Sequence, residues 1–196
     1  MNGEINFGEV YKEFYPKVLR YISRFVGNEA EDITQEVFEK ANSGLESFKG
    51  KSKLSTWIYR IATNLALDKL RSPSFKRFSE NLTEEIEDIS VWTRHKKPSV
   101  DRQLIRKQMS ECVREHIDKL SLDYKTVIIL SELEGFNNKE IADILQISID
   151  NVKMRLHRAR ASLKKILDEA CDFYHNEQNI LSCDKKTQII KFKKSG

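Results

Sequence analysis

The stretch NNKEIADILQISIDNVKMRLHRARASLKKIL, residues 137–167, predicts two helices joined by a tight turn. Asn137 can cap the first, short helix, and Glu140 three residues later completes the pattern of a capping box. Residues 146–148 form the turn, after which Ser148 or Asp150 can cap a longer helix. Apolar residues recur in this longer helix at spacings of three and four, which gives one buried stripe. The stripe consists of Ile149, Val152, Leu156, Ala159, Leu163 and Ile166.

The opposite side of the longer helix is basic. A capped short helix, a tight turn and an amphipathic basic helix have the layout of a helix-turn-helix, in which the second helix enters the major groove of DNA. Arginine can donate twice to guanine and asparagine can pair with adenine, whereas lysine and the remaining arginines meet phosphates. A solvated basic face on an ordinary surface helix is the alternative. The residues expected to face DNA are Asn151, Lys153, Met154, Arg155, His157 and Arg158.

The composition favours helices in small domains. Of the 196 residues, 39% are hydrophobic and 33% are charged, and glycine and proline are scarce. No segment approaches the roughly 18 apolar residues of a membrane span. The N-terminus also lacks the pattern of a signal peptide, so no membrane insertion is expected. The three cysteines are widely spaced, which argues against a disulfide framework and for a reducing, cytoplasmic location.

Apolar spacings predict a helical N-terminal part. One helix is expected at residues 5–26, with Pro16 kinking or dividing it. A second is expected at residues 29–41, ended by the Asn42-Ser43-Gly44 sequence. A third begins at Ser52 or Ser55 and runs to about residue 71.

The regular apolar spacing ends after the third predicted helix. Residues 73–98 carry blocks of like charge without a sustained period, which is typical of a linker. A second helical unit begins near Asp101, and its apolar stripe includes Cys112 and His116, for which we expect core packing. The predicted fold is therefore all-α, with two small helical domains joined by a linker. The expected boundaries are residues 1–72, the linker 73–100, residues 101–168 and a C-terminal extension 169–196.

Three long motifs resemble the sigma-70 family. Residues 29–41, EAEDITQEVFEKA, and residues 48–71, FKGKSKLSTWIYRIATNLALDKLR, resemble region 2 of the extracytoplasmic-function (ECF) type. Residues 122–167, from LDYKTVIILSELEGF to the longer helix, are similar to region 4 of the same group. The resemblance implies a protein that is not an enzyme, binds core RNA polymerase and directs it to promoter DNA. Many relatives are also held inactive by an anti-sigma factor.

The resemblance also implies a role for individual residues. The region 2 helix would dock on the clamp coiled coil of polymerase through Asp32, Gln35, Glu36 and Phe38. The following loop and helix would contact the −10 element through Lys49, Ser52, Lys53, Thr56, Tyr59, Arg60 and Asn64. The expected DNA-facing residues of the region 4 helix, given above, would contact the −35 element. Trp57 could be a stacking platform or a core residue, and we expect it in the core.

Three departures from the family pattern make the −35 sequence unpredictable. Ser121 stands where a proline often opens region 4, and Asp150-Asn151 replaces a frequent Gly-Thr pair. Met154 replaces a small polar residue, and its thioether cannot donate to a base edge. Met154 would therefore contact a thymine methyl group or nothing.

Two other classes of protein compete with a sigma factor. A free-standing helix-turn-helix regulator would never contact polymerase, and it would have no need of residues 29–71. An enzyme is not indicated, because no nucleophile, base and orienting group cluster and no glycine-rich phosphate loop is present. We therefore expect no small-molecule substrate and no cofactor.

The C-terminal extension contains three soft metal ligands, Cys171, His175 and Cys183. A structural zinc site usually needs four ligands, and this spacing fits no zinc-finger pattern. We therefore expect no metal site, and instead a capping helix followed by a basic tail. A regulatory role for the tail, such as sensing redox state, is a further alternative.

Overall fold

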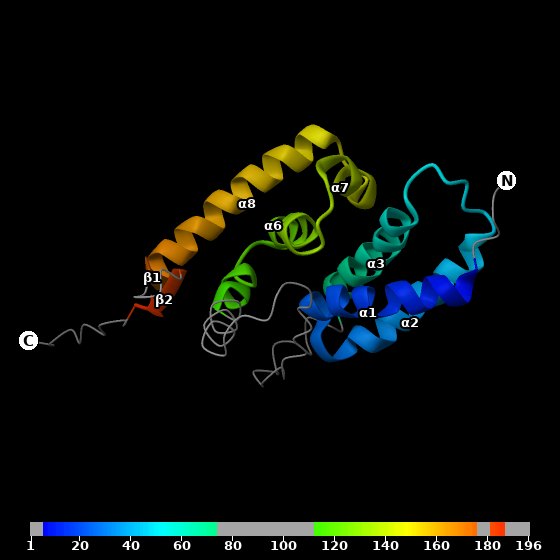
Figure 1. Cartoon of the computed structure of the whole chain (residues 1–196), viewed down its shortest axis with the longest axis horizontal. Helices are drawn as coiled ribbons and strands as arrows, with labels where there is room; N and C mark the ends of the chain where they lie inside the picture. Colours follow the sequence, from blue (N-terminus) through cyan, green and yellow to red (C-terminus); the bar gives the residue numbers. More distant parts are fainter. Residues whose placement is uncertain (1–5, 74–111, 176–180, 187–196) are drawn as a thin grey trace, which may run out of the picture. The chain divides into compact units, whose positions relative to one another are not determined.

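The computed structural model describes residues 6–73, 112–175 and 181–186 (Figure 1). These residues form two compact units. The first unit lies within residues 1–90 and 130–152, and the second unit lies within residues 91–129 and 153–196. Most of the described residues are helical, which confirms the all-α prediction apart from a short hairpin. The expected linker and the start of the second helical part fall largely outside the described residues.

Three helices form the core of the first unit. They are α1 (Phe7–Val26), α2 (Ala30–Leu45) and α3 (Leu54–Arg71), and a 3-10 turn at Gly27–Glu29 connects the first two. Each of the three packs against the other two. Val18, Ile22 and Val37 are fully enclosed, and the buried Tyr21 hydroxyl shares a hydrogen bond of 2.8 Å with the Thr63 hydroxyl.

Helices α1 and α2 each differ from prediction in one respect. Helix α1 is continuous through Pro16, and the Asn6 side chain caps it by accepting from the amide of Gly8 at 2.8 Å. Helix α2 continues past the expected break to Leu45. A Cβ atom at Gly44 would lie 2.9 Å from Trp57 Cζ2, so this glycine lets the half-buried Trp57 ring approach the helix. Close packing, rather than a helix stop, accounts for Gly44.

The helix-turn-helix has the expected local structure. Helix α6 (Leu122–Ile128) continues as a π-helical turn (Ile129–Leu133), and helices α7 (Asn138–Leu145) and α8 (Ile149–Ala170) follow. Asn137 and Glu140 form the predicted capping box. Gln146 adopts a left-handed conformation with φ of 57° in the turn, and the Ser148 hydroxyl accepts from the amide of Asn151 at 3.2 Å.

The buried stripe of α8 is shorter along the helix than predicted. Val152, Leu156 and Ala159 are buried, at 0–2% exposure. Ile149, however, is 41% exposed, so the prediction that it joins the stripe is wrong. Leu163 and Ile166 are half-buried. The stripe is therefore most enclosed in the part of the helix that carries the expected DNA-facing residues.

The second unit ends in an antiparallel hairpin instead of the predicted capping helix. Strands β1 (Cys171–His175) and β2 (Leu181–Lys185) pair directly, with Phe173 opposite Cys183. Aromatic residues favour such strands over a helix, and the Tyr174 hydroxyl donates to Asp184 at 3.4 Å. The amide of Lys186 donates to the carbonyl of Ala170 at 2.8 Å, which ties the hairpin to the end of α8.

None of the helices in the described part of the chain is both long and apolar enough to cross a membrane.

The cap of α7 gives a stability prediction. The Asn137 carboxamide accepts from the amides of Lys139 and Glu140, both at 3.0 Å. Asn137→Ala should therefore lower the free energy of unfolding by about 1 kcal/mol, measured by urea denaturation. Asn138→Ala makes the same side-chain change one exposed position later and should have little effect. Equal losses in the two variants would contradict a capping role.

Candidate nucleic-acid and polymerase interfaces

The orientation of α8 about its own axis leaves a basic face exposed to solvent. Because Val152, Leu156 and Ala159 are buried, the positions between them point outward. Lys153, Met154, His157 and Arg158 are all exposed, with Met154 at 43%, and Asn151 is exposed at the start of the helix. Five of the six side chains expected to face DNA are thus accessible on the first turns of α8.

Arg155 differs from the other five residues. It is half-buried, and its guanidinium forms an ion pair of 3.2 Å with Asp123 within the second unit. A guanidinium held by a carboxylate has fewer donors left for a base or a phosphate. Arg155 is therefore better placed to orient α8 than to contact a base edge.

The acidic face of α2 carries three of the four residues expected to bind polymerase. Asp32, Gln35 and Glu36 are exposed. Phe38 is buried at 2%, and its ring lies 5.0 Å from Tyr11 and 5.8 Å from Tyr15. The expectation that Phe38 belongs to a docking face is wrong for its side chain, because the ring packs against α1. Its contribution to that face is to hold α2 in place.

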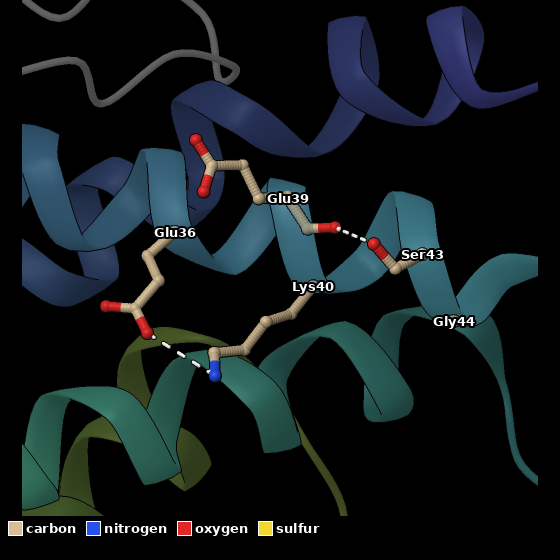
Figure 2. A pocket seen from close by; sticks show the side chains of 5 residues that line it. All are labelled: Glu36, Glu39, Lys40, Ser43 and Gly44. Atoms are coloured by element: carbon tan, nitrogen blue, oxygen red, sulfur yellow. Dashed lines mark hydrogen bonds and ion pairs between the residues drawn. The ribbon is translucent and has the colours of Figure 1, made fainter.

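Two shallow hollows extend along this face. Figure 2 shows the first, in which the Glu36 carboxylate forms an ion pair of 3.4 Å with Lys40 while the Glu39 carboxylate points away from that pair. The second hollow lies between α2 and α3. It is lined by Glu29, Asp32, Ile33, Glu36, Leu65, Asp68 and Lys69. Acidic side chains therefore predominate on this face, including Glu29 and Asp68, which the sequence motif did not indicate.

The seven residues expected to contact the −10 element lie in the loop before α3 and in α3 itself, and they differ in exposure. Lys49, Lys53 and Asn64 are exposed, and Ser52 and Arg60 are half-buried. Thr56 and Tyr59 are buried at 0% and 3%, so the expectation that they form an exposed polar face is wrong. The reason is that α3 packs against α1, α2 and α7 within the first unit.

A buried carboxylate explains the position of Tyr59. The Tyr59 hydroxyl donates to Glu134 at 2.7 Å, and the Arg24 guanidinium forms an ion pair with the same carboxylate at 2.7 Å. The Tyr59 ring also lies 4.7 Å from the ring of Phe136. Burial, followed by the charge of Glu134, raises the pKa of Tyr59 above its ordinary value. Tyr59 is therefore a neutral hydrogen-bond donor in this arrangement.

Two further polar side chains of the expected −10 surface are engaged in the same way. Arg60 donates through Nε to the carbonyl of Asp143 at 2.7 Å, and the Lys53 ammonium forms an ion pair of 2.8 Å with Glu140. The hydrogen bond from Lys53 is the largest cause that lowers the pKa of Glu140. Residues 134–143 thus occupy polar atoms of Lys53, Tyr59 and Arg60 within the first unit. The sequence pattern does not predict the role of Glu134, because this residue lies 110 positions from its partner Arg24.

The cysteines lie together in the second unit. The Sγ atoms of Cys112, Cys171 and Cys183 are all within 4.8 Å of one another. Burial, followed by the neighbouring Cys112 thiol, raises the pKa of the Cys171 thiol to about 11. His175 is exposed and does not belong to this group, so the grouping of Cys171, His175 and Cys183 is wrong. Cys112 and His116 are buried, as the core-packing prediction requires.

Comparison with known proteins identifies two regions. Residues 10–75 match the family Sigma-70 region 2, and residues 110–163 match Sigma-70, region 4. The ECF RNA polymerase sigma factor SigW of Bacillus subtilis is 33% identical over 165 residues, which cover 82% of this chain and 88% of SigW. The ECF RNA polymerase sigma-E factor of Haemophilus influenzae is 32% identical over 161 residues, 81% of this chain and 85% of that protein.

Solved structures support the same fold at lower sequence identity. The sigma factor RpoE from Bartonella quintana, in complex with the anti-sigma factor NepR, superposes with a TM-score of 0.60. It is 22% identical, and the match covers 83% of this chain and 96% of that one. CnrH, in complex with the cytosolic domain of CnrY, gives a TM-score of 0.58 at 22% identity over 83% and 87% of the two chains.

A free-standing helix-turn-helix regulator is not favoured by these comparisons, because region 2 is present as well as region 4. Sigma factors are in general initiation factors without enzymatic activity. The two regions occur in the family's order, and the ECF relatives match over more than four fifths of their length. The chain therefore belongs to the sigma-70 family, as an RNA polymerase sigma factor of the extracytoplasmic-function type that directs transcription from promoters.

Proposed function

We propose that α8 contacts the −35 element through the basic face that starts at Asn151. The observation that carries this proposal is the burial of Val152, Leu156 and Ala159, which leaves Lys153, His157 and Arg158 outward on consecutive turns. Arg158 is the side chain able to donate twice to a guanine, whereas Lys153 suits a phosphate. Met154 offers only an apolar contact, which fits a thymine methyl group.

The −10 element is proposed to bind the loop before α3 and the exposed end of that helix. Opening a duplex costs a few kcal/mol for each base that leaves the stack, and a protein recovers this by gripping the extruded base and the single strand. Lys49, Lys53 and Asn64 are accessible for such contacts. Lys53 and Arg60 must first leave Glu140 and the carbonyl of Asp143, so residues 134–143 compete with the DNA strand for these two side chains.

Core polymerase is proposed to bind the acidic face of α2. Asp32, Gln35 and Glu36 project from one side of this helix, next to the hollow that Asp68 also lines. An acidic face suits a basic helical partner, and such complementarity chiefly sets the association rate and the choice of partner. Phe38 acts indirectly, through its packing on Tyr11 and Tyr15.

An anti-sigma factor is a further proposed partner, and the cytoplasm is the proposed location. The solved structures with this fold include the sigma factor RpoE bound to the anti-sigma factor NepR. An anti-sigma factor that covered the exposed acidic face of α2 and the basic face of α8 would prevent polymerase and promoter DNA from binding there.

Co-purification with core polymerase, followed by run-off transcription on genomic fragments, tests the function as a whole.

The −35 assignment predicts a selective loss of DNA binding. Arg158→Ala should weaken binding of the holoenzyme to its −35 duplex by about 5-fold to 150-fold, because a bidentate contact to guanine contributes about 1–3 kcal/mol. Affinity for core polymerase should not change. Lys165→Ala removes an equal charge farther along α8 and serves as the control. Equal losses in the two variants, or a parallel loss of polymerase binding, would count against this assignment.

The polymerase assignment predicts an effect of charge reversal. Asp32→Lys should weaken binding to core polymerase by at least about tenfold, because it places a like charge against a basic partner. Glu31→Lys is the matched control, since Glu31 is also exposed in the first turn of α2 and the two changes cost the helix a similar amount. Binding would be measured by competition with a labelled sigma factor. If Glu31→Lys is as damaging as Asp32→Lys, the docking face lies elsewhere on α2.

The −10 assignment predicts opposite effects at two paired residues. Lys53→Ala should weaken binding of the full-length protein to a single-stranded −10 oligonucleotide, because a phosphate contact is removed. Glu140→Gln should strengthen it, because Lys53 loses its protein partner while glutamine preserves the capping box. Fluorescence anisotropy at low salt measures both. Weaker binding in both variants would show that the Lys53–Glu140 pair supports the fold and does not compete with DNA.

A further inference from the structure

The three cysteines of the chain meet at one place in the second unit. Cys112 lies in the helical segment 112–117, Cys171 opens β1, and Cys183 lies in β2. Their Sγ atoms are within 4.8 Å of one another, and those of Cys112 and Cys171 are 3.5 Å apart. Cys112 and Cys171 are buried at 6% and 2% exposure, and Cys183 is half-buried.

Backbone pairing of the hairpin sets this geometry. Cys171 is opposite Lys185, and Cys183 is opposite Phe173. Because alternate residues of a strand share a face, Cys171 and Cys183 are diagonal neighbours on one face of the hairpin. The hydrogen bond from the amide of Lys186 to the carbonyl of Ala170 holds the hairpin against the end of α8. Main-chain structure thus places the two hairpin thiols beside each other at the end of α8.

The spacing of the sulfur atoms fits a shared metal ion. Four ligands arranged tetrahedrally around zinc, with Zn–S bonds of about 2.3 Å, have sulfur atoms about 3.8 Å apart. The Cys112–Cys171 separation of 3.5 Å is close to that value, and the sulfur atoms of the other two pairs lie within 4.8 Å of each other. A disulfide needs about 2.05 Å between its sulfur atoms, and all three thiols are free.

His116 supplies a fourth donor one helical turn after Cys112. Its Nδ1 atom lies 3.8 Å from Cys112 Sγ and 2.6 Å from the carbonyl oxygen of Cys112, and the residue is buried at 4%. His116 is not among the described residues whose ligand atoms lie within 4.8 Å of one another, so its imidazole would have to turn from the Cys112 carbonyl to join the three sulfur atoms. Three cysteines and one histidine form one of the common ligand sets of structural zinc.

We propose that Cys112, Cys171, Cys183 and His116 bind one zinc ion. The ion would fasten the C-terminal hairpin to the helical segment that begins region 4, so that the order of the extension depends on metal. The proposal is independent of the DNA and polymerase interfaces, since none of these four residues belongs to them. It also replaces the sequence-based grouping that contained His175.

Cobalt provides a direct optical test on the full-length, reduced protein. After removal of metal with a chelator, Co²⁺ should bind at one equivalent and give the near-ultraviolet charge-transfer band of cobalt–thiolate bonds. One equivalent of Zn²⁺ should abolish that band. Each single Cys→Ser change should lower it by about one third, because one of three thiolates is lost. His116→Ala should keep the band and alter only the visible transitions, whereas His175→Ala should match the unaltered protein.

A second measurement needs no variant and so does not depend on variant folding. One equivalent of Zn²⁺ should slow alkylation of all three thiols by at least about tenfold, because a metal-bound thiolate is withdrawn from reaction. Absence of the cobalt–thiolate band together with unchanged alkylation would overturn the proposal. A Cys112–Cys171 disulfide in the protein as isolated, found by mass spectrometry without bound metal, would overturn it in favour of a redox pair.

Discussion

Burial of one stripe on each amphipathic helix is the constraint on which both proposed interfaces depend. Enclosing a Val, Leu or Ile side chain gains roughly 1.5–3 kcal/mol, so two such residues and a closely packed alanine fix the rotation of a helix about its axis. In α8 these residues are Val152, Leu156 and Ala159, and in α2 they are Ile33, Val37 and Ala41. The opposite faces, basic in α8 and acidic in α2, follow from that rotation. The core therefore orients the surface that partners meet.

A buried carboxylate adds a second constraint in the first unit. Glu134 accepts a hydrogen bond from Tyr59 and pairs with Arg24, which joins α1, α3 and the segment before α7. Removal of one partner from such a pair leaves an uncompensated buried charge, which is more costly than loss of an exposed ion pair. In the same unit the exposed Lys53 pairs with Glu140. This arrangement links the stability of the first unit to the residues proposed for the −10 element.

The C-terminal extension has a different physical basis from the helices before it. A hairpin of two five-residue strands is marginal by itself and needs further packing or a cross-link. Here the hairpin is tied to α8 through Lys186 and lies against Cys112 through two thiols. The first restraint acts at Ala170, where α8 ends, and the second acts in part at the next residue, Cys171. This explains how a short polar segment after region 4 holds a defined structure.

The sequence by itself determined the helices, the capping box, the turn at residues 146–148 and the outward face of α8, because these depend on local periodicity and on side chains a few positions apart. The family motifs also determined the class of protein. Only the tertiary structure decided that Phe38, Thr56 and Tyr59 are buried, that Arg155 pairs with Asp123 and that Cys112 replaces His175 beside Cys171 and Cys183. The physical reason is that burial, ion pairs and thiol clusters arise between residues far apart in the chain, and a pattern of near neighbours carries no information about them.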